Sequence, residues 1–523
     1  MVDWLTLIMT ILVSVGLLIC NIYLLAYYCH PDDRDSCIGW VAKIFVVLGL
    51  TLAWSQVLLL PLDVSNNRTF GGGLNMKAFW FIIYISTAIY ILLVFPIVSG
   101  FYESDEEWTF CEKFRHSLCC FFVTLFCFLI LSIILYVTIG KAKVPINLDY
   151  RIIQNIKSDD KTLHASDSNR ESTKIDIKVS YVIYILAMLS FISWILFAIF
   201  GGIGMAAVPL DFFHDFCTRP KSIKSEVIRE RREKLLSNLE ELQELGKNVK
   251  EMEQNGYDKL FIFNKKRRKY NKKLRVFKAG ALLAEEEFYI CNLSEEIRKK
   301  NNCVIIFYYL LIPLGILSLI ATILWIIQFI CTYFYTKDGG ERSGYPFLSY
   351  MFIYFQDHDC GFLSFIFFSL LALYLLFTVI KGNIKFGVRF FFCWTIYPMK
   401  KDETYMNAFL FNVTLILLAS ISVTQFCSDC LRDYVAFTDI DLLFNIQIKY
   451  LKFFIIFYKY HIFQYIWFGM FVLSTIYLLC RPRDRMEPVL KSGRISDPKR
   501  RQEMSNLLKN NNISNNSKNS DKS

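Results

Sequence analysis

The chain has 523 residues, of which 54% are hydrophobic and 16% aromatic, and its formal net charge is +11. These apolar and aromatic shares exceed ordinary soluble usage and argue against a string of soluble domains. The positive charge gathers in residues 211–302 and after Cys480. That placement favours a basic surface beside a membrane and argues against a nucleic-acid partner.

Nine long apolar segments follow one another along the chain. About 20 apolar residues in a helix span the roughly 30 Å hydrocarbon core of a bilayer, because each residue adds about 1.5 Å. We therefore predict an all-α fold, a polytopic helical membrane protein with about nine transmembrane helices. The predicted spans cover residues 4–28, 38–62, 77–102, 115–140, 180–208, 303–335, 361–380, 405–426 and 460–480.

The tripeptide Pro-Leu-Asp occurs at the ends of two predicted spans. Pro61 and Asp63 end the second span, and Pro209 and Asp211 end the fifth span on the opposite face. Opposite-facing copies are a feature of the inverted repeats of transporters. The alternative is that proline and aspartate simply end both helices, as they commonly do.

A glycosylation signal follows the second span. Asn67 begins the triplet Asn-Arg-Thr in the predicted loop after that span. If this loop lies in the lumen, Asn67 is a possible N-glycosylation site. The alternative is a polar turn residue.

Small residues recur along the fifth span. Ala198, Gly202 and Ala206 are spaced by four, and Gly201 and Gly204 lie alongside them. Small residues at this spacing let the backbones of membrane helices approach closely. We interpret this stretch as a helix-packing surface.

The segment 211–302 is the one large charged stretch between spans. A stripe of apolar residues with 4-3-7 spacing is typical of an amphipathic or coiled-coil helix: Leu235, Leu239, Leu242 and Val249. A second stretch, 274–297, is apolar at looser helical spacing, and the basic run 265–273 lies between the two. The pattern predicts a helical hairpin with a basic turn.

Basic residues cluster beside the ends of spans five, six and nine. The clusters are Arg219, Lys221 and Lys224, then residues 298–300, then Arg481, Arg483 and Arg485. All three fall on one face, which the excess of Lys and Arg in cytosolic loops marks as cytosolic. We therefore predict that the insert and the C-terminus are cytosolic, and that the N-terminus is lumenal or extracellular.

The predicted organisation has four parts. Residues 1–210 form an N-terminal bundle of five spans, and residues 211–302 form the cytosolic helical or coiled-coil insert. Residues 303–482 form a C-terminal bundle of four spans. The tail 483–523, rich in Asn, Ser and Lys, has too few apolar residues to offset the cost of ordering, and we predict that it is disordered.

Sequence signatures of catalysis and metal binding are missing. No Gly-rich phosphate loop, paired-His zinc signature or Gly-x-Ser-x-Gly elbow occurs, and no two of the six His are spaced as metal ligands. We therefore expect no enzyme activity, no catalytic residues, no metal and no cofactor. Cys427 and Cys430, predicted at the lumenal end of span eight, form a possible disulfide or redox pair.

Polar residues inside the predicted spans are almost all neutral. Lys43 and Asp63 lie near the ends of span two. The other polar positions that stand out are Gln56, Gln328, Asn407, Asn412 and Gln425. Charges deep in a span usually mark ion or proton paths. Their scarcity argues against an acid-relay proton pump, but it leaves a passive pathway, a carrier of uncharged solutes or a receptor cavity open.

Five stretches carry an ordered set of motifs: residues 27–33, 199–210, 406–413, 421–427 and 458–464. Together they resemble the lipocalin-interacting membrane receptor (LIMR) family, in particular its plant and protist branch. The resemblance runs from span one through span nine, with the same central insert, and fails only in the Asn-rich tail. The loop 63–76 lacks the cysteines of plant members, so no loop disulfide carries over.

The resemblance implies a membrane role but no catalytic residue. Animal members include a lipocalin receptor, a lysosomal protein that assists cobalamin export with an ABC transporter, and proteins linked to signalling-receptor trafficking. We expect a multi-pass receptor or trafficking escort that binds a ligand or membrane partner and recruits cytosolic factors through its insert. The alternative is a transporter, or a transporter-assisting subunit, for a small or lipidic solute such as a cobalamin-like cofactor.

The predicted membrane fold and the family resemblance also indicate partners and location. We expect contact with membrane lipids, a membrane-protein or cytosolic protein partner, and no nucleic acid. The expected location is an endomembrane, such as endosome, lysosome or Golgi, or the plasma membrane.

Overall fold

The structure is a computed structural model. It describes residues 4–30, 39–70, 73–104, 108–139, 141–147, 172–178, 180–217, 225–257, 265–299, 302–334, 347–358, 361–390, 394–397, 399, 404–436, 438–441, 448, 451 and 454–480. The tail for which disorder is predicted, 483–523, lies outside the described residues.

Nine helical spans among the described residues are long and apolar enough to cross a membrane. Eight spans are single helices: α1 (Trp4–Tyr28), α3 (Gly39–Phe70), α6 (Phe110–Ile139), α8 (Tyr181–Cys217), α11 (Asn302–Tyr333), α13 (Gly361–Phe386), α14 (Met406–Cys430) and α18 (Ile462–Cys480). The third span consists of three successive helices: α4 (Met76–Ile89), η1 (Tyr90–Val94) and α5 (Phe95–Tyr102). The predicted polytopic, all-α membrane fold is confirmed.

The chain splits into two compact units. Unit 1 contains Met1–Leu210 and Ile316–Leu478, and unit 2 contains Asp211–Gly315 and Leu479–Ser523. The spans of the N-terminal and C-terminal halves therefore pack together in unit 1 and do not form two separate bundles.

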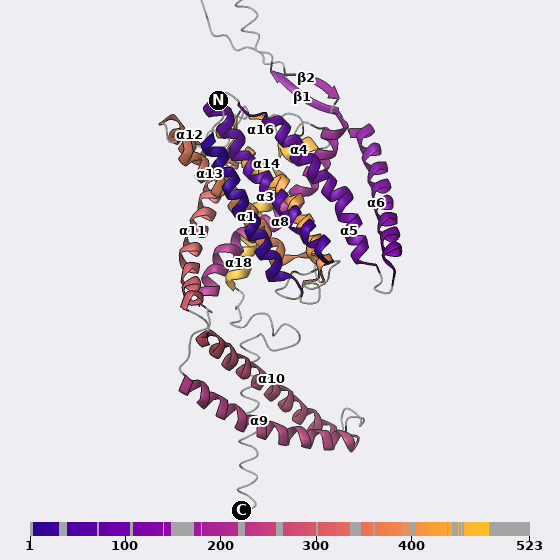
Figure 1. The fold of residues 1–523 in the computed structure, drawn as a ribbon, viewed down its shortest axis with the longest axis vertical. Coiled ribbons are helices and arrows are strands. Elements are labelled where there is room, and N and C mark those ends of the chain that lie inside the picture. Colours follow the sequence, from indigo (N-terminus) through magenta and orange to yellow (C-terminus); the bar gives the residue numbers. More distant parts are fainter. Residues whose placement is uncertain are drawn as a thin grey trace, which may run out of the picture. The chain divides into compact units, whose positions relative to one another are not determined.

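Helix α14 is the centre of unit 1. In its membrane-crossing segment 83% of the residues are buried, against 11% in α1 and 11% in α6. It packs against α3, α13 and α5. Figure 1 shows α14 among the other spans and α6 at the edge of the unit. The first and fourth spans therefore leave most of their apolar surface open to lipid.

The third span contains a π-helical turn. The N–H of Phe95 donates to the carbonyl of Tyr90, five residues earlier, and not to the usual fourth. Pro96 follows directly, and proline has no N–H to donate and crowds the carbonyl four residues before it. The wider turn accommodates the proline without ending the span.

Short elements connect the spans. Strand β1 (Lys141–Asn147) pairs antiparallel with β2 (Ser172–Lys178), and β3 (Val388–Phe390) pairs antiparallel with β4 (Trp394–Ile396). Four short helices also occur: α12 (Phe347–Asp357), α15 (Arg432–Val435), α16 (Asp439–Asp441) and α17 (Phe454–Lys459). The hydropathy pattern does not predict these elements, because each is too short to cross a membrane.

The prediction that Pro-Leu-Asp ends two spans is wrong. Helix α3 continues past Pro61 and Asp63, and α8 continues past Pro209 and Asp211. Transmembrane helices tolerate an internal proline because neighbouring groups satisfy the freed carbonyls. The tripeptide therefore provides no common helix end that could mark an inverted repeat.

The predicted loop around Asn67 is also wrong. The backbone of Asn67 lies on α3, which ends at Phe70. The side chain of Asn67 lies outside the described residues, so its glycosylation stays a prediction.

Unit 2 contains two long helices, α9 (Ser225–Gln254) and α10 (Lys265–Lys299), which pack side by side (Figure 1). The pairing is antiparallel, because Arg232 contacts Glu295 while Gly246 lies against the ring of Phe277. The predicted basic turn is wrong. The basic run 265–273 forms the first turns of α10, and the connection precedes it.

Candidate functional site

A row of polar side chains runs along the buried helix α14. We call this row the polar seam, and its members are Asn412, Ser420, Thr424, Gln425 and Asp429. Water cannot satisfy polar groups inside a bilayer, so each must find a partner within the protein. The contacts of the polar seam therefore show how the spans are held together.

The seam begins near the N-terminus of α14. Asn383 of α13 donates through Nδ2 to Oδ1 of Asn412 at 3.1 Å, and Asn412 donates to the backbone carbonyls of Tyr397 and Ala408. We call the end of unit 1 at which α14 begins the inner end. The amide of Asn412 thus joins α13, the segment after β4 and its own helix.

A carboxylate organises the same inner end. Glu103, just after α5, accepts hydrogen bonds through Oε1 from Tyr397 at 2.9 Å and from Asn407 at 3.0 Å. Because the Tyr397 hydroxyl donates to this carboxylate, and its phenolate would be repelled by it, the pKa of Tyr397 is raised above its ordinary value. Glu103 therefore fixes the start of α14 against the end of the third span.

Midway along the seam, Gln56 of α3 joins three helices. Its Nε2 donates to Thr87 of α4 at 2.5 Å, and its Oε1 accepts from Ser420 of α14 at 2.6 Å. Further along α3, Asp63 accepts from Trp80 Nε1 of α4 at 2.9 Å and from the backbone N–H of Ile440 at 3.4 Å. Asp63 therefore joins α4 and α16 to α3.

Toward the other end, Gln425 joins α14 to α8. Its Oε1 accepts from Ser190 and from Trp194, each at 2.6 Å. The hydroxyl of Tyr458, on α17, lies 3.3 Å from that of Ser190. Burial raises the pKa of Tyr458 to about 12, which keeps the phenol neutral and able to donate.

Asp429 forms a cluster at the outer end, which we define as the end where α3 and α14 finish. Its Oδ2 accepts from the hydroxyl of Tyr333 at 2.7 Å and from Nε2 of Gln464 at 3.4 Å. His461 Nδ1 lies 4.0 Å from the same oxygen, and its side chain is 30% exposed. The cluster joins α11, α14 and α18 at this end of the spans.

The possible disulfide is absent, and this prediction is corrected. Cys427 and Cys430 are free thiols, and both are buried on α14. The Sγ of Cys430 lies 3.8 Å from the hydroxyl of Tyr333. Both thiols therefore belong to the packing around the Asp429 cluster.

An apolar cavity of about 480 Å³ lies beside the seam, and we call it the side cavity. Its walls come from α4 with η1, from α6 and from α8. Helix α6 is fixed on both sides of it: Ser117 donates to the carbonyl of Ile97, and the hydroxyls of Ser132 and Tyr181 lie 2.7 Å apart. The side cavity thus lies between the two hydrogen-bonded positions of α6, Ser117 and Ser132, and residues of the π-helical turn form part of its wall.

The small residues predicted as a packing surface all lie buried on α8. A Cβ on Gly202 would lie 2.7 Å from the carbonyl oxygen of Trp467 in α18, and one on Gly204 would overlap the backbone of Thr378 in α13. Gly201 lies against the ring of Phe197. Ala198 and Ala206 complete this surface, which lets α8 approach α13 and α18 at backbone distance.

Within the described ranges, no group of three or more His, Cys, Asp or Glu residues is placed to hold a metal ion. The contacts that the described residues of the polar seam make are hydrogen bonds and apolar contacts. The structure brings together Asp63, Cys427 and Cys430 with the polar seam and its surroundings. Pro61 lies within α3, and Pro209 and Asp211 lie within α8.

Comparisons with known proteins identify the family. The family model described as LMBR1-like membrane protein matches residues 6–300. A LIMR family protein of Dictyostelium discoideum is 33% identical over 502 residues, covering 89% of this chain and 95% of that protein. The chain belongs to the LIMR family. The resemblance seen in the sequence motifs is confirmed.

Plant members of the LIMR family match over a similar extent. A LIMR family protein of Arabidopsis thaliana is 32% identical over 507 residues, covering 90% of this chain and 94% of that protein. One from Oryza sativa is 30% identical over 497 residues, covering 89% and 94%. No solved structure matches. Membership of the LIMR family therefore identifies the chain as a membrane protein, and the geometry of the site is known from this structure alone.

Sequence reasoning missed several residues of the Asp429 cluster. Tyr333 and Gln464 are far from Asp429 in the chain, and neither carries a charge that would mark it. The sequence did carry a signal for His461 and Gln464, because both lie in the motif stretch 458–464. In the structure, His461 adopts a left-handed φ of 51°. A non-glycine residue with this conformation is uncommon and often marks a turn with a special role.

Proposed function

We propose that this LIMR-family protein is a membrane receptor or trafficking escort. Its spans hold a ligand or partner in the membrane, and the α9–α10 hairpin recruits cytosolic factors. One observation carries the proposal: the hairpin is part of a compact unit of its own, and large apolar side chains remain exposed on it. These side chains are Val227, Leu236, Leu239 and Phe288.

The interior of the hairpin supports a rigid recruiting module. Four α9 residues repeat at steps of seven and are largely withdrawn from solvent: Ile228, Leu235, Leu242 and Val249. A seven-residue repeat is the pattern of coiled-coil packing. Leu242 also packs directly against Gly280 of α10. A Cβ added to Gly280 would lie only 3.0 to 3.2 Å from side-chain carbons of Leu242. Such a hairpin presents its remaining surface without first having to fold.

An ion pair supports the same register. Arg232 Nη2 lies 2.5 Å from Glu295 Oε2 and 3.1 Å from the side-chain oxygen of Asn292. The two charged side chains are 42% and 25% exposed, so their attraction is screened and contributes at most about 1 kcal/mol. The pair serves to fix the alignment of α9 and α10 more than to hold them together.

The interior of unit 1 supports a hydrogen-bonded framework and not a route for polar solutes through the membrane. The amides of Gln56, Asn412 and Gln425 bind groups on neighbouring helices. A path for polar solutes needs such groups turned toward the solute, and here they face one another. We propose no enzymatic role and no cofactor for this arrangement.

A second candidate function has one specific observation in its favour. The side cavity is apolar, has walls from three spans and contacts the π-helical turn, and such turns frequently occur at functional sites. An apolar cavity of this kind suits a lipidic solute. The alternative is therefore a transporter, or a transporter-assisting subunit, for a lipidic solute.

The proposal assigns partners and orientation. The partners are membrane lipids and a membrane or cytosolic protein, and nucleic acid is not among them. The insert and C-terminus lie in the cytosol and the N-terminus on the opposite face. The membrane is an endomembrane or the plasma membrane.

Co-purification from native membranes tests the recruiting surface. The double variant Leu236→Ser, Leu239→Ser removes exposed apolar contacts, and we expect it to lose partners that the wild-type protein retains. Asn238→Ser is the matched control, because Asn238 is exposed on the same helix and contributes no apolar side chain. We expect the control to keep its partners.

Two results would overturn the escort function. One is that the double variant keeps every partner of the wild-type protein, and that a variant without the hairpin keeps them too. The other is uptake of an apolar solute by vesicles containing the purified protein alone, which would favour the transporter.

A further inference from the structure

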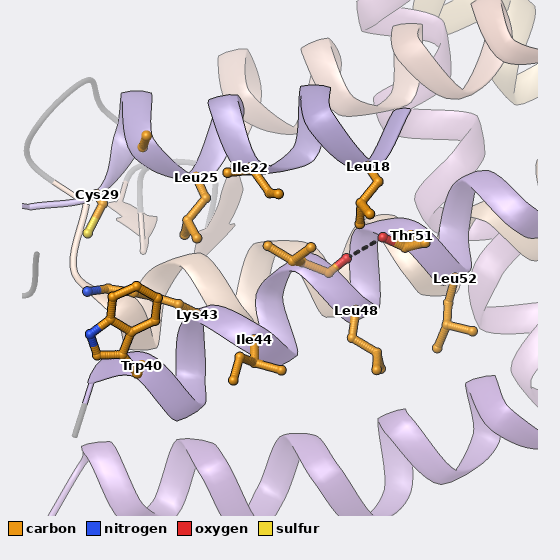
Figure 2. Close-up of a pocket in the computed structure, with 12 residues that line it drawn as sticks. Leu18, Ile22, Leu25, Cys29, Trp40, Lys43, Ile44, Leu48, Thr51 and Leu52 are labelled. Atoms are coloured by element: carbon orange, nitrogen blue, oxygen red, sulfur yellow. Dashed lines mark hydrogen bonds between the residues drawn. The ribbon is translucent and has the colours of Figure 1, made fainter. Parts of the chain in front are cut away.

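A second apolar recess, of about 780 Å³, lies between α1 and α3, and we call it the α1–α3 groove. Figure 2 shows side chains of both helices facing it. Most of its lining is aliphatic, and the larger contributors are Leu18, Ile22, Leu25, Ile44, Leu48 and Leu52. Ile22 and Ile44 are more than half exposed, so the groove opens toward the lipid side of α1.

The groove is a fixed feature of the fold, because α1 is attached on both sides of it. Near the middle of the span, Asn21 donates to Thr51 at 3.2 Å and accepts from Trp54 at 3.0 Å. At the inner end, the N–H of His30 donates to the carbonyl of Thr404 at 3.0 Å. Between these attachments the two helices leave a gap that their own side chains do not fill.

The positively charged side chain of Lys43 lies at the inner end of the groove. Nζ of Lys43 lies 5.3 Å from the centre of the Trp40 ring, within the range of a cation–π contact. Lys43 is 9% exposed, whereas Trp40 is 62% exposed. Figure 2 shows both side chains together at one end, near Cys29. Tryptophan prefers the level of the lipid headgroups, so this pair places a positive charge at the membrane surface.

The length of the groove matches one leaflet. Lys43 and Leu52 are nine residues apart on α3, which corresponds to roughly 14 Å along the helix. Half of a hydrocarbon core of about 30 Å is about 15 Å. An acyl chain whose headgroup lies beside Lys43 would therefore reach the bilayer centre near Thr51 and Leu52.

We propose that the α1–α3 groove binds one anionic glycerophospholipid of the cytosolic leaflet. One acyl chain lies along the aliphatic lining, and the headgroup phosphate faces Lys43 and Trp40. The orientation uses the predicted topology, in which the start of α3 lies on the same face as the insert. Anionic lipids are concentrated in that leaflet. The site is separate from the recruiting hairpin and adds a lipid ligand to the protein.

Photolabelling tests the site. The full-length protein is reconstituted in phosphatidylcholine vesicles that contain a trace of phosphatidylserine with a diazirine near the middle of one acyl chain. After irradiation, mass spectrometry locates the labelled peptides. We expect label on the groove-facing residues of α1 and α3, and several-fold less label there from a phosphatidylcholine probe with the same chain.

Variants separate headgroup from chain recognition. Lys43→Gln should lower the phosphatidylserine label in the groove by about five-fold, the effect of one lysine near an anionic surface. Lys43→Arg should retain it. Leu48→Trp should lower the label from both probes, because the larger ring occupies the chain position; Leu48 is exposed, so the fold should tolerate the change. Arg115→Gln, at the exposed inner end of α6, is the control and should change nothing.

Three outcomes would overturn the proposal. Equal groove labelling by the two probes would mean that only a neutral lipid chain binds. Label unchanged in Lys43→Gln would remove the role of the charge. Label absent from α1 and α3 would mean that another occupant, such as a protein helix, fills the groove. Each variant must elute from size exclusion as the wild type does.

Discussion

Helices α14 and α1 cross the same membrane and are built in opposite ways. The segment of α14 is 83% buried and carries the polar seam, whereas that of α1 is 11% buried and mostly apolar. Without a hydrophobic driving force between helices in lipid, packing and hydrogen bonds must hold a bundle together. The densest row of buried polar residues therefore marks the centre of unit 1, and the helices with most of their surface open to lipid mark its edge.

The comparison also separates two kinds of site. Around α14, polar groups such as Gln425 are engaged with Ser190 and Trp194, so the centre is a closed framework. Along α1 and α6, apolar recesses open between a peripheral helix and that framework. Under our proposals, ligands bind at the edge of unit 1, and the hydrogen bonds at its centre stabilise the fold.

Glycine substitutions test this division with the largest expected effect. Gly204→Leu, on α8, would place a side chain into the backbone of α13, whereas Gly469 of α18 has nothing within 4 Å of an added Cβ. Overpacking costs about 1–3 kcal/mol, and contact with backbone lies at or above the top of that range. We expect low expression and early thermal unfolding in detergent for Gly204→Leu. Gly469→Leu should behave like the wild type; equal behaviour of the two variants would contradict the division.

Tyrosine substitutions test the same division with a smaller effect. Tyr333→Phe removes the hydroxyl that donates to Asp429 at 2.7 Å, and a lost hydrogen bond to a buried carboxyl group costs about 1–3 kcal/mol. Tyr23 of α1 is 70% exposed, so Tyr23→Phe should leave the unfolding temperature unchanged. Thermal unfolding in the same detergent provides the measurement. A loss of stability in the α1 variant as large as that in Tyr333→Phe would break the comparison.

Much of this fold could be predicted from the sequence. Nine apolar segments predict nine spans because spanning a bilayer requires length and apolar character in one continuous run. The positions of single residues in helices were less predictable. Pro61 and Pro209 looked like helix ends, yet a helix in lipid continues through proline when neighbours satisfy its carbonyls.

The polar contacts could not be predicted, for a different reason. Gln56, Asn412 and Gln425 stood out as polar residues inside spans, but their partners Ser420, Asn383 and Ser190 were unknown. Gln56 and Ser420 are separated by 364 positions, and no local pattern relates them. In the insert, Leu235, Leu242 and Val249 of the predicted stripe are largely withdrawn from solvent, but Leu239 is 42% exposed and Ile228, one repeat earlier, is buried in its place. The basic run was mistaken for a turn, whereas it forms the start of α10.

The most direct test of the account is to replace residues 226–299 by a short flexible linker in cells that otherwise lack the protein. The account predicts that the variant folds, reaches its membrane and retains the α1–α3 groove label, but fails to restore the biological effect. A carrier located in the spans would keep part of its transport without the hairpin. Full rescue by a correctly located linker variant would contradict the escort function.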